Sequence, residues 1–420
     1  MRRRNFIALF LMIFAIDSAT MLSWNSVEAA TVQQDQPTTH KLPAGGKVTI
    51  RQVFGELSVI GVSGDTVTIE AKNDDGEPAE VKVMQEAQDL LISTEVDGPR
   101  RKKRAISLEV KIPSSANLTI ESQAGEISVL DITGQTAIRA GGGEIKLVNV
   151  GSLVAATGGG EVTVQKVTGT VEIRTGGGEL QVSDVSGAVS LITGGGEVTT
   201  SNTGDLEVRT GGGDVVVQDV HGSASIATGS GDLVVSKVEG NCELKSGHGD
   251  ASLRDISGNV ALSNVSGDVV AQNIGGNMAV ASISADMDLK CVKGRVEVRN
   301  ASGSVQLAHI GGDIEVTSTS GDVTLSTEIA QGNRYRIKTT SGNLLMMVPE
   351  SASGFSVNLS SYTGTVESNL KLEGSTSTEK KLTGQYGEGR GEIVLDTFSG
   401  SVSLKKGAVK NQSDCGKKSE

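Results

Sequence analysis

A short pattern of Gly, an acid and an apolar residue returns about every 18 residues through the middle of this 420-residue chain. Successive copies begin at Gly125, Gly143 and Gly160, and the last begins at Gly321. A period of this length indicates a solenoid, in which each repeat contacts only its neighbours and the fold grows in one dimension. The usual relation between chain length and the number of compact domains therefore does not apply.

Each repeat predicts two short strands and two corners. In the repeat 160–178, Val162 and Val164 alternate with polar residues, and so do Val171 and Ile173. Such alternation places one side of each strand in a core. A second glycine series, about nine residues out of phase, marks the other corner: Gly134, Gly151, Gly169, Gly187, Gly204, Gly222, Gly240, Gly258, Gly276, Gly294 and Gly312.

A nine-residue half-repeat is too small to bury a core of its own. If the repeats stack as rungs, their apolar positions line up in columns, and each strand pairs in parallel with the strands above and below. Burying one Val, Leu or Ile is worth roughly 1.5–3 kcal/mol, so about five per rung offset the ordering entropy only when neighbours are present. We therefore predict an all-β parallel solenoid, with about eleven regular rungs spaced ~4.8 Å apart.

The corners carry glycine runs such as 176–178, because some corner positions need a positive φ that only Gly adopts cheaply. A polar column stands just before them, and we expect its hydroxyls and amides to hydrogen-bond along the rod. The column is Thr157, Thr175, Thr193, Thr210, Thr228, Ser246, Asn264, Ser282 and Asn300. An acidic column follows the corner glycine: Glu126, Glu144, Glu161, Glu179, Glu197, Asp214, Asp232, Asp250, Asp268, Asp286 and Asp322, with Ser304 as the exception.

Residues 1–29 predict a secretory signal peptide. Arg2–Arg4 supply the charged start, Phe6–Ile16 the apolar run, and Val27–Ala29 a small-residue cleavage site. An uncleaved membrane anchor is the alternative, although eleven apolar residues are few for a bilayer. We expect no stable transmembrane span after cleavage, and a secreted, periplasmic or cell-surface location.

The rest of the chain divides by regularity. We expect a disordered linker at 30–46, an N-terminal β start and cap at 47–122, regular solenoid repeats at 123–326, irregular C-terminal repeats and a cap at 327–406, and a disordered tail at 407–420.

The composition argues against two classes of binding function. The formal net charge is −12, which argues against binding nucleic acid. Between Phe54 and Tyr335 there is no aromatic residue, so the middle of the rod offers no stacking platform for sugars or bases.

No constellation predicts catalysis, a cofactor or a metal. The glycine runs lead into strands rather than helices, there is no nucleophile elbow, and the four His are scattered. The acidic column lacks the spacing of calcium-binding nonapeptides. His221 and His248 lie at or beside corner glycines and are expected to be solvated. We therefore predict no catalytic, cofactor-binding or metal-ligating residues.

The sequence also contains one basic cluster and three cysteines. The basic run Arg100–Arg104 is expected to be an exposed loop tip, with contact to an anionic polymer as the alternative. Cys242, Cys291 and Cys415 are an odd number, which argues against a disulfide framework. Cys242 occupies an inward slot and should be a buried free thiol, unable to pair with Cys291 nearly three rungs away.

The recurring Ser-Gly-Asp-Val pattern, at 266–269 and 320–323, resembles the bacterial "putative adhesin" family, a domain of unknown function. The start of the array is similar too, at Gly55–Val59 and Val110–Pro113, and the resemblance covers Lys47 to Leu404. It implies an exported β-solenoid and supplies no catalytic residues to transfer.

We expect, from these features, a non-enzymatic adhesin-like scaffold or interaction protein of the cell envelope or surface. Envelope polysaccharide, an anionic polymer or another surface protein are the candidate partners. A polysaccharide-active β-helix enzyme and a self-assembling β-helical filament are the alternatives. Uncapped ends would favour the filament, and irregular charged caps would favour a monomer.

Overall fold

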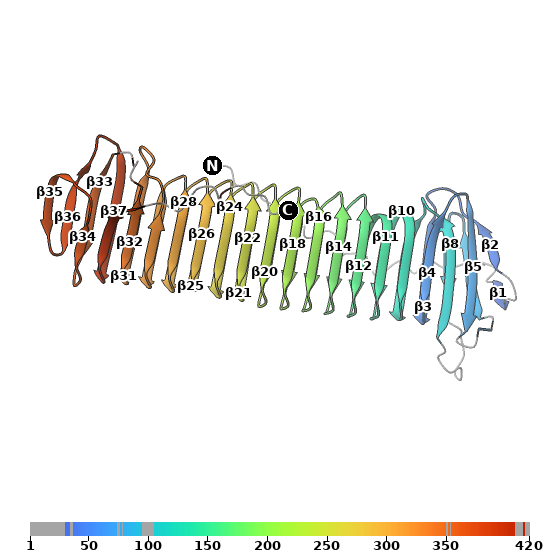
Figure 1. Ribbon diagram of the computed structural model, residues 1–420. Helices are drawn as coiled ribbons and strands as arrows, with labels where there is room; N and C mark the ends of the chain where they lie inside the picture. Colours follow the sequence, from blue (N-terminus) through green and yellow to red (C-terminus); the bar gives the residue numbers. More distant parts are fainter. Residues whose placement is uncertain are drawn as a thin grey trace, which may run out of the picture.

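The computed structural model describes residues 30–33, 37–73, 76–77, 79–94, 105–349, 352, 354–407 and 415. The predicted signal peptide and the basic run Arg100–Arg104 lie outside the described residues. Every regular element within that described part is a β-strand (Figure 1). The chain forms a parallel β-solenoid of about 13 turns, roughly 18 residues apart, so the predicted fold class is confirmed.

One wall of the rod stacks the first strand of each repeat: β12 (Val162–Val167), β14 (Leu180–Val185), β16 (Val198–Thr203), β18 (Val215–Val220), β20 (Leu233–Val238), β22 (Ala251–Ile256), β24 (Val269–Ile274), β26 (Met287–Val292), β28 (Val305–Ile310), β30 (Val323–Ser326) and β32 (Leu344–Val348). The longer strands β10 (Ile127–Ala140) and β11 (Ile145–Thr157) each contribute to both walls.

The opposite wall stacks the second strands: β13 (Val171–Thr175), β15 (Val189–Thr193), β17 (Leu206–Thr210), β19 (Ala224–Thr228), β21 (Cys242–His248), β23 (Val260–Ser266), β25 (Met278–Ser284), β27 (Val296–Ser302), β29 (Ile314–Ser320) and β31 (Arg334–Ser341). Neighbouring rungs are in register, as in the pairing of Val162 with Leu180. Equivalent residues therefore lie directly above one another.

The core is the stack of inward positions that the alternation predicts. In one turn Val162, Val164, Val167, Val171 and Ile173 are all buried, and the same five slots recur along the rod. Cys242 takes one of them and is a buried free thiol, as expected. Burial raises the pKa of this thiol to about 12, because the thiolate would be desolvated there.

The first strand contains a left-handed residue that the sequence analysis missed. Strict alternation would turn Val167 outward from Val164, but Lys166 between them has φ 58°, and this reverses the alternation so that both side chains face the core. The same position is left-handed in every regular rung: Asp131, Asn149, Lys166, Asp184, Asn202, Asp219, Lys237, Asp255, Asn273, Cys291 and His309. Asn and Asp tolerate this conformation better than most residues.

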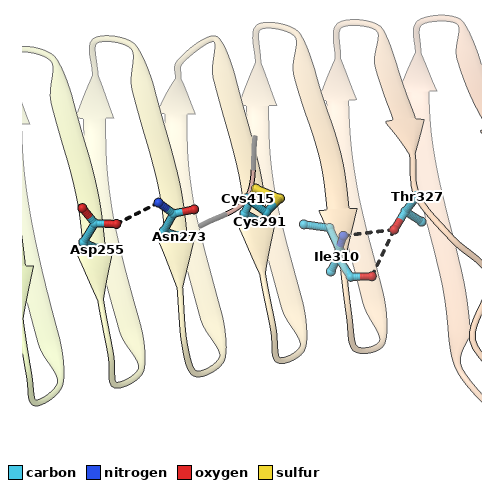
Figure 2. The surroundings of a disulfide bond; sticks show 6 residues. All are labelled: Asp255, Asn273, Cys291, Ile310, Thr327 and Cys415. Carbon is cyan, nitrogen blue, oxygen red and sulfur yellow. Dashed lines mark hydrogen bonds between the residues drawn. A yellow bond between two sulfur atoms is a disulfide. The ribbon is translucent and has the colours of Figure 1, made fainter. Parts of the chain in front are cut away.

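Side chains of this left-handed column bind one another along the rod. The Asn273 amide donates to Asp255 Oδ1 over 2.7 Å (Figure 2). Asn149 donates to Asp131 and Asn202 to Asp184 in the same way. Each pair joins two adjacent rungs on the surface.

The disulfide Cys291–Cys415 attaches the end of the chain to this column, with Cα atoms 5.5 Å apart (Figure 2). The inference from an odd cysteine count was therefore wrong. Cys242 lies in the core as a free thiol, and Cys291 and Cys415 pair with each other. The expected disordered tail at 407–420 stays a prediction, because 408–414 and 416–420 lie outside the described residues. Nine residues from Lys406 can reach roughly 30 Å, more than the ~19 Å of four rungs.

The N-terminal end does not follow sequence order. One rung consists of β3 (Lys47–Phe54) and β4 (Leu57–Val62). On its inner side these strands pair with β9 (Asn117–Ala124) and β10, respectively. On its outer side they pair with β7 (Asp89–Ser93) and β8 (Ile106–Pro113). Antiparallel strands then cover the outer rung: β5 (Thr66–Asn73) pairs with β8, and β6 (Glu80–Glu86) pairs with β7.

Within the segment 30–46, where a disordered linker is expected, the described residues 30–33 and 37–46 contribute two strands to this cap. The strand β1 (Ala30–Gln33) pairs with β6, and β2 (Thr38–Lys41) pairs with β5, both antiparallel. Leu42 is fully buried. The described residues of this segment pair with the edges of the cap and add an apolar side chain to its core.

The C-terminal end uses the same device. One rung consists of β37 (Gly391–Ser399) and β38 (Val402–Lys406). On its inner side these strands pair with β31 and β32. On its outer side they pair with β33 (Phe355–Ser361) and β34 (Val366–Ser368), which form the outermost rung. The strand β36 (Lys381–Tyr386) pairs antiparallel with β33, and β35 (Glu373–Thr378) pairs with β36 (Figure 1). The chain thus builds its outermost rung first and then returns to fill the rung beneath it.

One rung carries an internal defect. Thr200 stands between Val182 and Val217 in a core column, and Thr203 stands between Val185 and Val220. They are 1% and 0% exposed, and within the described structure neither hydroxyl has a hydrogen-bond partner. A buried hydroxyl without a partner destabilises the fold.

We expect Thr200→Val to raise the free energy of unfolding by about 1 kcal/mol, because it removes an unsatisfied hydroxyl and preserves the shape. The control is Thr199→Val on the outward side of the same strand, which should change stability by less than about 0.5 kcal/mol. Denaturant and thermal midpoints measure both. A lower midpoint for Thr200→Val would show that the hydroxyl has a stabilising partner.

Candidate binding groove

The corners show why this chain needs glycine. At Gly178 φ is +99°, and a Cβ built there would lie 2.2 Å from the carbonyl oxygen of Gly160 in the rung below. A Cβ at Gly176 would lie 2.6 Å from the oxygen of Gly158, whereas one at Gly177 would meet nothing within 4 Å. In these three-glycine corners the first and third positions are therefore closed to side chains, and the middle one is open.

The polar column behaves differently from the expectation. The Thr193 hydroxyl donates to Gly195 O over 2.6 Å and accepts from Gly195 N over 3.2 Å, both within its own corner. Thr157, Thr175 and Thr210 repeat this arrangement. At these threonines the predicted hydrogen bonds along the rod are wrong, because the glycine corner folds back over the hydroxyl and the column stabilises its own corner. Asn300 does donate along the rod, to Ala285 O of the rung below over 2.9 Å.

A groove of about 580 Å³ runs along the rod where the first corner glycines lack side chains. It crosses five rungs, and Val265 closes one end because that residue takes the position of the corner glycine. Its lining is Ile192, Thr193, Arg209, Thr210, Gly211, Ala227, Thr228, Gly229, Lys245, Ser246, Gly247, Ser263, Asn264 and Val265.

Charge alternates from rung to rung along the groove wall. Arg209 pairs with Glu207 (2.5 Å) and Lys245 with Glu243 (2.7 Å), while the rung between them presents Ala227. Equal charges on adjacent rungs would lie ~4.8 Å apart, and the alternation doubles this distance. The wall is thus a series of neutralised ion pairs separated by small or apolar side chains.

The acidic column has a structural use in its second half. Asp232, Asp250 and Asp268 each donate their backbone N–H to the Oδ1 of the aspartate one rung below, over 2.8–2.9 Å. Ser304 donates both its N–H and its hydroxyl to Asp286, which lowers the pKa of that carboxyl. In the first half, Glu179 instead contacts Gln181 of its own strand. The aspartates are acceptors for main-chain donors that the corner leaves without partners.

The opposite corner has a matching amide ladder. Asn259, Asn277 and Arg295 each donate their backbone N–H to the Oδ1 of the asparagine below, over 2.8–2.9 Å. Sequence reasoning missed it, although Asn241, Asn259 and Asn277 stand 18 residues apart.

The arrangement of the groove is suited to holding a ligand passively. Among the described residues that line it, Arg209 and Lys245 are the only charged side chains, and none is a carboxylate. In the ranges that the structure describes, no group of three or more His, Cys, Asp or Glu could hold a metal ion. His221 is exposed beside Glu239 and Asn202, and His248 is exposed at a corner, as expected of solvated positions. The prediction that no residue is catalytic or metal-ligating stays a prediction.

The model of the Toastrack DUF4097 family matches residues 44–293 and 240–405, which together span most of the chain. The chain belongs to the Toastrack DUF4097 family. A domain of unknown function with a β-solenoid fold is therefore established, while the Gly-Asp-Val pattern as a mark of the family stays a prediction.

Among solved structures, the chain is similar to a protein titled as a "putative cell adhesion protein" from Clostridium sporogenes ATCC 15579. The identity is 10%, the match covers 89% of this chain and 99% of that one, and the TM-score is 0.17. No curated protein matches the chain.

The corner geometry predicts opposite outcomes for adjacent glycines. Gly178→Ala should destabilise the rod by at least about 2 kcal/mol, because Ala adopts positive φ poorly and its Cβ meets backbone. Gly177→Ala should change stability by less than about 0.5 kcal/mol, since Ser230 and His248 already occupy this position in later corners. Equal melting temperatures of the two variants would contradict the corner geometry.

The acidic column predicts that an oxygen acceptor matters more than a charge. Asp250→Ala should cost about 1 kcal/mol, because the Asp268 N–H loses its acceptor, and amide hydrogen exchange at Asp268 should accelerate. Asp250→Asn keeps Oδ1 and should retain most of the stability, as Asn343 does in the same column. If Asn proves as damaging as Ala, the charge rather than the acceptor stabilises the corner.

Proposed function

We propose that this protein is an exported, non-enzymatic, adhesin-like scaffold of the cell envelope or surface, and that the glycine groove holds its partner. The partner class is an extended envelope polymer, with polysaccharide as the leading candidate. A groove that crosses five rungs along the rod axis suits a chain-like ligand better than a compact one.

The observation that carries this proposal is the disulfide between Cys291 and Cys415. Disulfides persist in oxidising compartments and are rare in the reducing cytosol. This supports export, in agreement with the signal-like residues 1–29. Within the described residues, no helix is long and apolar enough to cross a membrane.

The side chains of the groove favour binding over catalysis. Hydrolysis of a glycosidic bond requires a pair of carboxyl groups beside the substrate, and the lining contributes none. Its two basic side chains are already paired with Glu207 and Glu243. The polysaccharide-active enzyme is therefore the weaker alternative.

The two ends of the rod weigh against a filament. At the N-terminal end antiparallel strands cover both strands of the outermost rung, and at the C-terminal end β36 covers β33, so among the outermost parallel strands described only the three-residue β34 lacks an antiparallel strand beside it. At the C-terminal end the outermost strand, β35, is exposed and polar throughout its length. Both features support a separate, finite rod.

The groove can be blocked without changing charge. Ala227→Leu fills its centre, and Ser225→Leu adds the same side chain on the exposed side of the same strand, outside the groove. We expect Ala227→Leu to weaken binding to isolated cell-envelope fragments about 10-fold, with Ser225→Leu binding as the wild type does. Sedimentation of the purified rod with the fragments measures both.

Equal binding by the two variants would show that the groove is not the contact surface. Recovery of a reduced protein with its full leader from the cytosol would contradict export itself. Circular dichroism of both variants checks that they keep the β-rich fold.

A further inference from the structure

The C-terminal end of the rod presents a pair of exposed aromatic side chains. Tyr362 and Phe398 are 67% and 54% exposed, and no other aromatic side chain in the described residues is as open to solvent. Both stand in the column that begins with the corner glycines of the groove. Within the array that column reads Gly211, Gly229, Gly247, Val265, Ile283, Ala301, Thr319, Thr340, Phe398 and Tyr362 in spatial order.

The fold does not require large rings at these two positions. Gly, Ala and Thr occupy the same column elsewhere, and the inward core slots of these rungs are filled by other residues such as Leu359 and Leu395. Leaving two aromatic rings in water forgoes the favourable burial that such side chains usually gain. Their presence at the tip therefore indicates a function other than packing in the core.

The rings are held in a defined geometry. Their centroids are 4.7 Å apart and their planes differ by 12°. Main-chain hydrogen bonds fix the spacing, from Tyr362 N to Thr397 O (3.1 Å) and from Thr363 N to Phe398 O (3.0 Å). The Lys380 ammonium lies 5.9 Å from the centre of the Tyr362 ring. The two rings thus stand stacked on adjacent rungs, side by side on the surface.

One ring face remains open. Tyr362 covers Phe398 from the outer rung, and the residue in register on the other side is Thr340, which is too short to cover a phenyl ring. The next column outward adds polar groups beside the rings: Lys338, Asp396 and Ser360 are in register there, and the Ser360 hydroxyl donates to Asp396 Oδ1 over 2.7 Å. An aromatic face is thereby bordered by hydrogen-bond donors and acceptors.

We propose that this aromatic patch, comprising Tyr362, Phe398, Lys338, Asp396 and Ser360, binds a pyranose ring of a glycan. A pyranose has an apolar C–H face, which packs on an aromatic ring, and a rim of hydroxyls, which bind carboxylate, hydroxyl and ammonium groups. Asp396 accepts and Lys338 donates at that rim. The choice of an envelope glycan rests on the proposed function, although the patch lies at the tip and not in the groove.

A glycan fits the patch better than a protein segment does. The side chains around the rings are Thr340, Thr363, Lys380 and the polar residues of the neighbouring column. A protein contact site centred on aromatic anchors usually has further apolar side chains around them, which form the core of the interface. Here the surround is polar and exposed, as suits a ligand covered in hydroxyls.

The test compares the wild type with the double variant Tyr362→Ala/Phe398→Ala on immobilised glucan, N-acetylglucosamine and galactan oligosaccharides, using octyl-agarose as the apolar matrix. We expect the wild type to bind at least one glycan and the double variant to bind it at least 10-fold more weakly. The control is Ile283→Ala, which removes an exposed apolar side chain of the same column and should bind as the wild type does.

Absence of glycan binding by the wild type, or equal binding by the double variant, overturns the proposal. Retention on octyl-agarose alone, lost in the double variant, also overturns it and makes the pair an apolar docking surface. The envelope-fragment assay with Ala227→Leu reads the groove independently. If that variant is defective while the aromatic double variant is not, the proposed function stands and the aromatic site fails.

Discussion

The close approach of main chains at the corners is the constraint on which the rest of this structure depends. Rungs stack ~4.8 Å apart, and at Gly178 the corner passes so near Gly160 that a Cβ would lie 2.2 Å from its carbonyl oxygen. A corner of this conformation must therefore be glycine, so the glycines recur with the length of one turn, and Ala285 is the one residue of the array that replaces this glycine. The same absence of side chains opens the groove, which ends where Val265 replaces a corner glycine. Fold and candidate site thus share one cause.

Stacking in register places each residue type beside its own copies. This favours apolar columns and ladders of Asp or Asn, because an acceptor on one rung meets a main-chain N–H on the next, as between Asp232 and Asp250. Like charges repel where no such donor lies between them, and along the groove Glu207–Arg209 and Glu243–Lys245 are separated by an uncharged rung. Surface pairs of this kind add little stability individually. Their arrangement instead sets a regular pattern of charge along the groove.

The local periodicity of the sequence predicts most of the fold. The features that it does not predict depend on residues far apart in the chain. The alternation of Val162 with Val164 and the inward slot of Cys242 follow from neighbouring residues alone. The left-handed column could have been found, since Asp184 and Asn273 stand between apolar residues three apart, a spacing that simple alternation forbids. The partner of Thr193 could not, because it depends on how the glycine corner folds back. The pairing of Cys415 depends on where the chain end returns, which no local pattern encodes.

The ends show how a one-dimensional fold acquires a definite length. A rung added in sequence order always leaves a new parallel edge. A regular repeat therefore does not by itself limit the number of rungs. Here the chain builds an outer rung, covers it with the antiparallel β36, and then returns as β37 to fill the space beneath. The strand β33 pairs in parallel with β37 on one side and antiparallel with β36 on the other, so the parallel stack ends at β33. At the N-terminal end the chain follows the reverse order, forming the second rung of β3 and β4 before the outer strands β7 and β8, which β6 and β5 cover. Antiparallel strands thus flank the outermost rung at each end, while the groove lies along the side of the rod and the aromatic patch lies near its C-terminal tip.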